Sequence, residues 1–236
     1  MIDYHCHILP GVDDGCRDLD ESLALAQVLT AAGFKEVHCT PHCIHGVYDN
    51  TPSSVRTAVE QLQQQITREG IPLRLHAGME YYLDEYFPHK LSDVQPLGES
   101  SLLLVEFPMQ HIDPEQIKEQ IFQIVRKGYT PVLAHPERYQ FLIPQEETAG
   151  LLDGFKRLFG KAQQESELSV PGLLAELQQQ GCLLQGNIGS LVGYYGRKVQ
   201  ENAERFQRAG FYRFWGSDGH HPEPTARFLE KAKGLY

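Results

Sequence analysis

MIDYHCHILPGVDDG, residues 1–15, opens the chain with two histidines one residue apart, a Pro-Gly turn and two adjacent aspartates. Side chains alternate between the two faces of a β-strand, so the imidazoles of His5 and His7 point to the same side if this stretch is extended. Both can then reach one cation at about 2.0–2.1 Å. An isolated pair of this kind is equally well explained as two surface histidines. Other motifs in the chain are needed to choose between metal binding and this alternative.

Composition and charge narrow the class of protein. The chain has 236 residues, 41% hydrophobic and 22% charged. No apolar run approaches the roughly 18 residues that cross a bilayer, so we expect a globular protein without membrane insertion. The start lacks the basic and apolar stretches of a secretory signal, which favours a cytoplasmic location. The formal net charge of -10 disfavours nucleic acid and anionic membranes as partners, because both bind through basic residues.

The cysteines favour reduced thiols. Their number is odd and no CxxC spacing occurs, so we expect no structural disulfide. A cysteine-dependent phosphatase needs an arginine at a fixed spacing after its nucleophile, and no cysteine here has one. We expect the thiols to fill small apolar spaces near the sheet rather than to act as nucleophiles. The five are Cys6, Cys16, Cys39, Cys43 and Cys182.

Strand-like runs alternate with helical patterns along the chain, which is typical of βαβ units and a parallel sheet. We find no internal repeat and no low-complexity linker, so a single domain over residues 1–236 is the simpler interpretation. The seven predicted strands are 2–7, 36–40, 73–80, 101–107, 130–135, 182–187 and 212–218.

Capping signals define four helices between the strands. The first is predicted over 19–32, with Asp18 as N-cap, Glu21 at the capping-box position and Gly33 as the stop. In the third, apolar residues recur on one face; they are Ile117, Ile121, Ile124 and Val125. The second, third and fourth helices are predicted to begin at Pro52, Pro114 and Arg197 and to stop at Gly70, Gly128 and Gly210.

The residue at or just past each predicted strand end is repeatedly one that can bind metal. In a parallel β/α barrel the carboxyl ends of all strands open onto one face, where active sites are built. Seven separate segments would therefore bring ligands to one cleft, and we predict a multinuclear metal site. The residues are His5, His7, His42, Glu80, Glu106, His135, Asn187, Asp218 and His220.

The glutamates have a distinct role in this prediction. Several divalent cations within about 4 Å repel one another, and bridging anions are needed to hold them together. We expect Glu80 to be such a bridge. Glu106 follows the apolar run SLLLV, where an ionised carboxylate is rarely left unpaired. The alternative for both is an exposed glutamate at a strand end.

Two arginines are candidates for phosphate binding. Arg138 follows His135 in HPERY, and a guanidinium beside a metal cluster suits bidentate recognition of two phosphate oxygens. A salt bridge from Arg138 to Glu137 or Glu146 is the alternative. Arg227, after the SDGHHPEPTA segment, is a candidate for a second guanidinium.

Seven segments, in this order, resemble one family. They are HCHILPGVDDG, TPH at 40–42, GMEYYL, LLLVEFP, AHPERY, GNIGSLVGYYG and SDGH. Together they resemble the PHP (polymerase and histidinol phosphatase) superfamily, and more closely its bacterial protein-tyrosine phosphatases, the partners of tyrosine kinases that control capsule and exopolysaccharide synthesis. The resemblance spans nearly the whole chain. It implies an α/β protein with a distorted (β/α)7 TIM-like barrel, the PHP fold, holding three divalent ions, most often Mn2+, with iron or zinc as alternatives.

The resemblance also assigns residues by motif. It implies that Arg138 binds phosphate, and His42 or His220 is a candidate for passing a proton through water. One ion would be held by His5, His7, Glu80 and Asp218, a second by Glu80, Glu106 and His135, and the third by Asp14, His42 and His220, with Asp13 as the alternative to Asp14.

The chain departs from the family pattern in two places. The stretch between the HPERY and GNIGSL segments is long, and we expect a helical insertion around 144–171. The arginine expected soon after SDGH comes late, at Arg227, which weakens its assignment.

The expected reaction is hydrolysis of phosphotyrosine, on a protein such as the tail of a bacterial tyrosine kinase, by attack of a metal-bound hydroxide. Two alternatives stay open. One is a PHP phosphatase acting on a small metabolite such as histidinol phosphate, and the other is a metal-stabilised protein that binds a kinase without chemistry.

Overall fold

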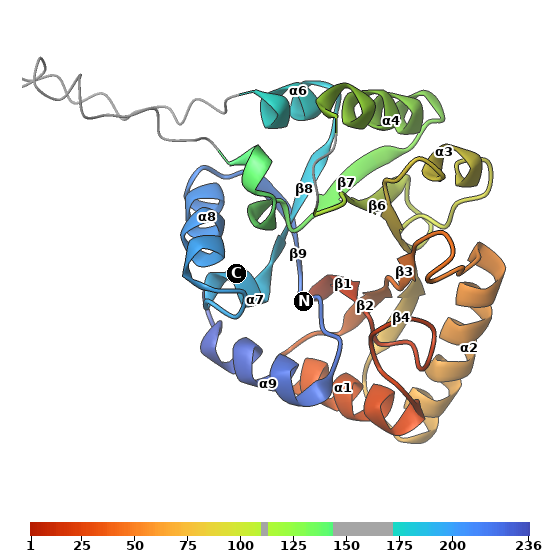
Figure 1. Ribbon diagram of the computed structural model, residues 1–236. Coiled ribbons are helices and arrows are strands. Elements are labelled where there is room, and N and C mark those ends of the chain that lie inside the picture. The colour runs from red at the N-terminus through yellow and green to blue at the C-terminus, as the bar shows by residue number, and fades with distance from the viewer. Residues whose placement is uncertain (110–112, 144–171) are drawn as a thin grey trace, which may run out of the picture.

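Parallel strands form the centre of the protein, and helices surround them (Figure 1). This arrangement is that of a computed structural model, which describes residues 1–109, 113–143 and 172–236. The helical insertion expected around 144–171 lies outside the described residues. Among the helices that are described, none is both long enough and apolar enough to cross a bilayer.

The strands form two parallel sheets within the described residues. The first has the order β1-β2-β4, from β1 (Ile2–Cys6), β2 (Glu36–Cys39) and β4 (Arg74–Ala77). The second has the order β3-β5-β6-β7-β8-β9, from β3 (His42–Cys43), β5 (Glu80–Tyr82), β6 (Leu102–Glu106), β7 (Thr130–Ala134), β8 (Leu183–Asn187) and β9 (Tyr212–Gly216). The parallel α/β arrangement confirms the predicted class.

The continuous strand predicted over 73–80 is wrong at its far end, because the chain bends between β4 and β5. A Cβ on Gly78 would lie 2.8 Å from the end of the Leu97 side chain and 3.3 Å from the Cys39 carbonyl oxygen, so a larger residue at this bend would have to displace Leu97. Pairing continues across it, since the Gly78 amide donates to the Cys39 carbonyl (2.9 Å) and the Glu80 amide to the Pro41 carbonyl (3.1 Å). If β2 with β3 and β4 with β5 each count as one bent strand, seven strand positions result. The complete (β/α)7 barrel stays a prediction.

The two ends of the described strand series meet. The amide of Asp218 donates to the His5 carbonyl (2.7 Å), and the amide of His7 donates to the Gly219 carbonyl (3.0 Å). Cys6 and Gly219 form a parallel bridge. Residues more than two hundred positions apart in the sequence therefore lie side by side.

The predicted helices are present. They are α1 (Leu19–Ala31), α2 (Pro52–Arg68), α4 (Pro114–Arg126) and α8 (Arg197–Arg208), and the structure adds α3 (Phe87–Lys90), α6 (Leu173–Gln179), α7 (Ile188–Leu191), α9 (Pro222–Lys231) and two 3-10 turns, η1 (Pro136–Arg138) and η2 (Gln140–Leu142). Asp18 caps α1 by accepting from the Glu21 amide at 3.0 Å. The expected return contact of the capping box is different, because the Glu21 carboxylate accepts from the amide of Arg17 and not from that of Asp18.

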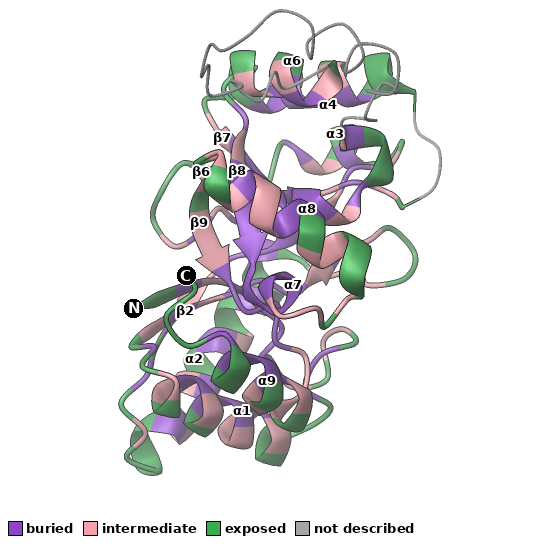
Figure 2. Ribbon diagram, turned by 90° about the vertical axis from the view of Figure 1, so that its left-hand side faces the viewer, coloured by how far each residue is buried: buried purple, intermediate pink, exposed green. Residues whose placement is uncertain are grey.

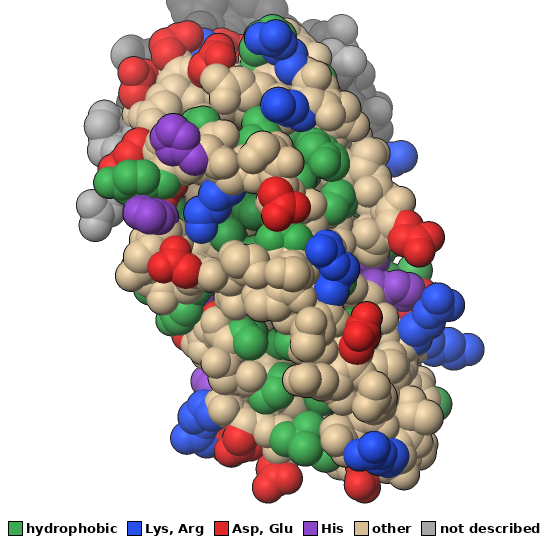
Figure 3. Space-filling view, turned by 90° about the vertical axis from the view of Figure 1, so that its right-hand side faces the viewer, with side chains coloured by type: hydrophobic (Ala, Val, Ile, Leu, Met, Phe, Trp, Pro, Cys, Tyr) green, Lys and Arg blue, Asp and Glu red, His purple; other side chains and the backbone are tan. Residues whose placement is uncertain are grey.

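Burial follows the strands and the inner faces of the helices (Figure 2). In α4, Ile117, Ile121 and Ile124 are buried as predicted, but Val125 is 39% exposed. Its position in the helical repeat puts it at the edge of the apolar stripe. The prediction of free cysteines is confirmed, since all five are reduced and buried. On the face shown in Figure 3, acidic and basic side chains are interspersed around hydrophobic ones.

Candidate metal centre

Imidazoles and carboxylates from six strand ends meet in one place. His5 is near the end of β1 and His7 just past it, His42 and Glu80 open β3 and β5, and Glu106 ends β6. His135 follows β7, while Asp218 and His220 follow β9. The structure thus brings these predicted ligands together, and all of them except His135 and Asp218 fall, with Asp14, into three groups that share members.

The innermost group consists of His5, His7 and Glu80, all fully buried. The Nε2 atoms of the two imidazoles are 3.0 Å apart. Oε2 of Glu80 lies 3.2 Å from Nε2 of His5 and 3.4 Å from Nε2 of His7. Three donor atoms therefore face one point.

A second group shares Glu80 and adds His42 and Glu106. His42 and Glu80 are directly paired in the β3-β5 register, which sets them side by side. Nδ1 of His42 lies 3.0 Å from Oε2 of Glu80 and 2.9 Å from Oε1 of Glu106. Glu80 therefore belongs to two groups, as a bridging carboxylate must.

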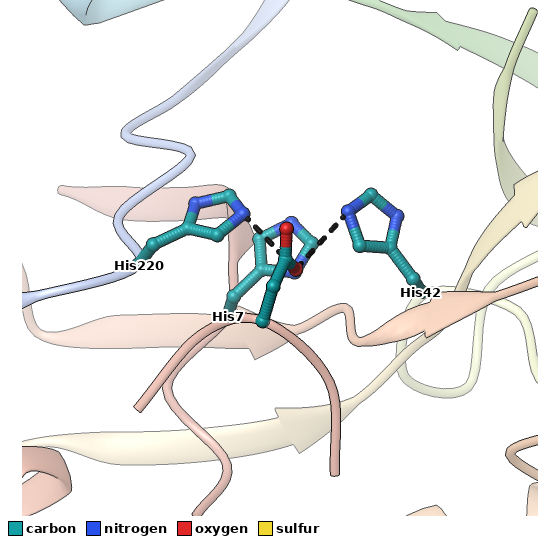
Figure 4. Close-up of side chains that lie close together, drawn as sticks. His7, His42 and His220 are labelled. Carbon is teal, nitrogen blue, oxygen red and sulfur yellow. Dashed lines mark ion pairs between the residues drawn. The ribbon is translucent and has the colours of Figure 1, made fainter. Parts of the chain in front are cut away.

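The third group lies toward solvent and joins His7, Asp14, His42 and His220. Figure 4 shows His42 and His220 on opposite sides of a carboxylate, that of Asp14, whose Oδ1 is 3.5 Å from Nε2 of each. The rings of His7 and His220 stack at 4.0 Å between centroids. The Asp14 side chain is 51% exposed, so the cluster opens to solvent here.

His135 and Asp218 complete the assembly. Nε2 of His135 lies 3.1 Å from Oε1 of Glu80, and Oδ1 of Asp218 lies 3.5 and 3.4 Å from Nε2 of His5 and His7. Both residues have a left-handed backbone, with φ of 36° and 53°, the only non-glycine positive φ values in the described chain. Such strain costs on the order of 1 kcal/mol or more, and it persists at functional sites where the surroundings impose it.

Two polar side chains orient the buried imidazoles. Oε1 of Gln185 lies 2.9 Å from Nδ1 of His5, and Oδ2 of Asp13 lies 2.7 Å from Nδ1 of His7. Holding Nδ1 in this way fixes the ring and turns Nε2 toward the centre. Asp13 also accepts from the amides of His42 and Gly15, so its carboxylate is engaged outside the three groups, and Asp14 takes the place beside His42 and His220.

The donor set fits divalent metal ions. Donors bound to one cation at about 2.0–2.2 Å lie about 3.0–3.4 Å from each other, and the separations within the three groups, 2.9–3.5 Å, are close to this. Nδ1 of His42, Oε2 of Glu80 and Oε1 of Glu106 are buried and close together, yet none has a hydrogen-bond partner among the described residues. A cation between them would satisfy all three. Imidazole with carboxylate suits manganese, iron and zinc.

Burial and neighbouring charges set the protonation of the cluster. Burial disfavours the charged form of Glu80, but the imidazoles of His5 and His42 outweigh it and lower the pKa of Glu80 well below its usual value. Burial and the charge of Glu80 raise the pKa of Glu106. Burial and the nearby Arg138 lower the pKa of His135 to about 4, which keeps this imidazole neutral at pH 7, the form that binds metal.

Arg138 lies beside the cluster, and among the described residues its ion pair is with Asp218 and not with Glu137. Its guanidinium pairs with Oδ2 of Asp218 and stacks on the Tyr195 ring, 3.6 Å from Cζ to the centroid. The Glu137 carboxylate instead accepts from the Asn187 amide and the Tyr212 hydroxyl, while Glu146 lies outside the described residues.

The structure does not bring Arg227 to the cluster. Arg227 lies on α9, where its side chain is 73% exposed and pairs with Glu223 one helical turn earlier. Because α9 begins at Pro222, the segment that follows SDGH is already helical and carries this guanidinium away into solvent.

The cysteines lack the properties of nucleophiles. Burial raises the pKa of Cys16 and of Cys182 to about 12, and burial also raises the pKa of Cys6, Cys39 and Cys43. Because only the thiolate attacks, these groups are unreactive at neutral pH.

Comparison with known proteins places the chain in a family. A family model described as capsular polysaccharide synthesis, CpsB/CapC, matches residues 1–158. The chain belongs to the CpsB/CapC family. This confirms the resemblance seen in the seven sequence segments.

Relatives of this CpsB/CapC chain carry consistent names. It is 32% identical to the tyrosine-protein phosphatase YwqE of Bacillus subtilis, over 99% of this chain and 85% of YwqE. It is 30% identical to the tyrosine-protein phosphatase CpsB of Streptococcus agalactiae, over 98% of this chain and 88% of CpsB.

Solved structures agree. A chain from the crystal structures of YwqE from Bacillus subtilis and CpsB from Streptococcus pneumoniae, described as metal-dependent tyrosine phosphatases, superposes with a TM-score of 0.76 at 30% identity, covering 99% of this chain and 88% of that one. The histidinol phosphate phosphatase of Lactococcus lactis superposes with a TM-score of 0.50 at 14% identity, over 98% of this chain and 93% of that one. The second likeness concerns the fold alone.

A close backbone contact beneath His5 gives a test of the centre. A Cβ on Gly216 would lie 2.5 Å from Cβ of His5 and 2.8 Å from Nε2 of Gln185. We expect Gly216→Ala to displace both side chains and to lower the affinity for divalent metal by at least about tenfold. Metal titration followed by elemental analysis measures this, with the exposed Arg213→Ala on the same strand as control. Unchanged metal affinity in a folded Gly216→Ala protein would contradict the proposed position of His5.

Proposed function

We propose that this CpsB/CapC protein is a metal-dependent tyrosine-protein phosphatase. The observation that carries the proposal is the set of three overlapping imidazole and carboxylate groups with a buried arginine beside them. Membership of a family with relatives named tyrosine-protein phosphatases, one of them in a structure described as metal-dependent, supports it.

We assign three divalent ions to the centre, with Mn2+ first and iron or zinc as alternatives. Each group would hold one ion, with Glu80 as the carboxylate shared by two of them, while His7 and His42, which each belong to two groups, would each bind a single ion. His135 and Asp218 are assigned as further ligands, because each faces a donor of the inner groups. Bound divalent ions would neutralise phosphate charge and lower the pKa of water.

The protein's own residues would bind and orient the substrate. Arg138 is assigned to the phosphate, since its guanidinium lies beside Asp218 with its Nε lacking a hydrogen-bond partner. Tyrosinate, with a pKa of about 10, is a leaving group that needs only modest proton donation. His42 and His220, the partly exposed imidazoles at 14% and 27%, are the candidates for relaying that proton through a water molecule, from a ring nitrogen that does not bind metal.

We infer that the substrate is a phosphotyrosine-bearing protein, and we assign the tail of a bacterial tyrosine kinase as that protein. The family's description as capsular polysaccharide synthesis supports this class of partner. A cytoplasmic location and a single domain over residues 1–236 belong to the same proposal.

Parallel kinetics on two substrates test the proposed function. With Mn2+ present we expect kcat/KM for a tyrosine-phosphorylated kinase-tail peptide to exceed that for histidinol phosphate, because the proposed substrate is a phosphotyrosine-bearing protein. Released phosphate is the measurement. Faster hydrolysis of histidinol phosphate would favour a metabolite phosphatase, and binding of the peptide without release of phosphate would favour a non-catalytic binding protein.

The bridging role of Glu80 predicts the effect of one substitution. Glu80→Gln removes the charge shared by two groups while keeping the shape, so we expect turnover to fall by at least about 100-fold without unfolding. Phosphate release and circular dichroism measure the two effects. The exposed Glu85→Gln, a matched change of charge just beyond β5, should keep full activity. Wild-type turnover in a Glu80→Gln sample with counted metal would reject the bridge.

Chelation and thiol alkylation should act in opposite ways. We expect a chelator to abolish turnover and added Mn2+ to restore it, because the reaction depends on bound cations. We expect iodoacetamide to leave turnover unchanged, because the five thiols are buried. Rates of phosphate release after each treatment check this. Inactivation by alkylation at one cysteine would instead point to covalent catalysis.

A further inference from the structure

Tyr195 contacts both the arginine proposed to bind phosphate and one of the proposed metal ligands. It lies in the loop between α7 and α8, in the segment GNIGSLVGYYG. Its ring lies against the Arg138 guanidinium, with Cζ 3.6 Å from the ring centroid. Its hydroxyl donates to Oδ2 of Asp218 at 3.2 Å. One side chain thus contacts the arginine assigned to phosphate and a carboxylate assigned to metal.

The ring contact restricts how Arg138 can point. When a guanidinium stacks on an aromatic ring, its N–H groups point outward in the guanidinium plane. There they remain free to donate hydrogen bonds. Nη2 is taken up by Asp218, and Nε is buried without a hydrogen-bond partner. The arginine side chain is only 17% exposed, so the Tyr195 ring forms one wall of its position.

The two oxygens of the Asp218 carboxylate have different partners. Oδ2 accepts from Arg138, from Nδ2 of Asn187 at 2.8 Å and from the Tyr195 hydroxyl. These three donors use the capacity of that oxygen. Oδ1, on the other side, faces the Nε2 atoms of His5 and His7. Asp218 is therefore held with one oxygen toward the imidazoles.

The glycines of the segment explain how Tyr195 reaches this place. Gly193 and Gly196, on either side of the tyrosine pair, have φ of 74° and 94°, which other residues adopt rarely. A Cβ on Gly189 would lie 3.3 Å from both the Tyr195 ring and Oδ1 of Asn187. The loop is thus shaped around Tyr195, whereas Tyr194 is 51% exposed and packs on Phe228.

We propose that Tyr195 is a positioning residue whose ring holds Arg138 for phosphate and whose hydroxyl holds Asp218 for metal. The inference rests on the proposed function, and it assigns separate effects to the two parts of one side chain. Loss of the ring should weaken phosphate binding, while loss of the hydroxyl alone should weaken metal binding.

Three variants separate these effects. Tyr195→Phe keeps the ring, Tyr195→Leu removes ring and hydroxyl, and Tyr86→Leu, at an exposed tyrosine away from the cluster, is the control, because Tyr194 packs edge-on against Tyr195. With saturating Mn2+, calorimetry should show that inorganic phosphate binds Tyr195→Leu about tenfold more weakly than wild type, and Tyr195→Phe within about twofold. Manganese titration should show a loss of affinity of about tenfold in Tyr195→Phe as well as in Tyr195→Leu. Tyr86→Leu should match wild type in both measurements.

An Arg138→Lys background makes the test specific. There, adding Tyr195→Leu should weaken phosphate binding no further, because the ring acts through the guanidinium. Wild-type phosphate affinity in a folded Tyr195→Leu protein, or the same tenfold loss in the Arg138→Lys background, would overturn the inference. Failure of the proposed function is a different result, namely wild-type protein that binds phosphate and Mn2+ but releases nothing from phosphotyrosine.

Discussion

The contact of one buried carboxylate with four imidazoles is the constraint on which the structure depends. Glu80 is fully buried; its Oε2 faces His5, His7 and His42 at 3.0–3.4 Å, and its Oε1 faces His135 at 3.1 Å. A carboxylate withdrawn from water costs several kcal/mol unless positive charge surrounds it, so these strand ends must converge. The bend at Gly78 and the pairing of β1 with the segment after β9 are what allow them to do so.

Around this contact lies a layer of side chains that hold other side chains in place. Gln185 and Asp13 each fix one imidazole through Nδ1, and Asn187 and Tyr195 hold the outer oxygen of Asp218. Because such contacts set the direction of donor atoms, a site of this kind depends on residues that never touch a metal or a substrate. Arg138 is both a holding and a held side chain, since it contacts Asp218 directly and is itself held by the Tyr195 ring.

The sequence predicted which residues would meet, because strand periodicity and the parallel arrangement place strand-end side chains on one face. The assignment of ligands to individual ions came from the family resemblance and stays a prediction. In the structure His42 lies in one group with Glu80 and Glu106, because of the β3-β5 register, while His135 faces the other oxygen of Glu80. Asp13 was an open alternative to Asp14, and their contacts distinguish them: Asp13 pairs with His7 and two backbone amides, whereas Asp14 faces His42 and His220. Gln185 was missed, although a glutamine two residues before Asn187 in a buried strand was a usable signal. The structure does not bring Arg227 to the cluster, because the segment after SDGH forms α9, which was not predicted and which carries this side chain into solvent.

The most direct test of the central claim is a crystal structure of the protein grown with Mn2+, with anomalous diffraction recorded to locate the ions. Three anomalous peaks are expected, one in each of the three overlapping groups, with Glu80 between two of them. Peaks outside these groups, or none among them at saturating Mn2+, would contradict the claim.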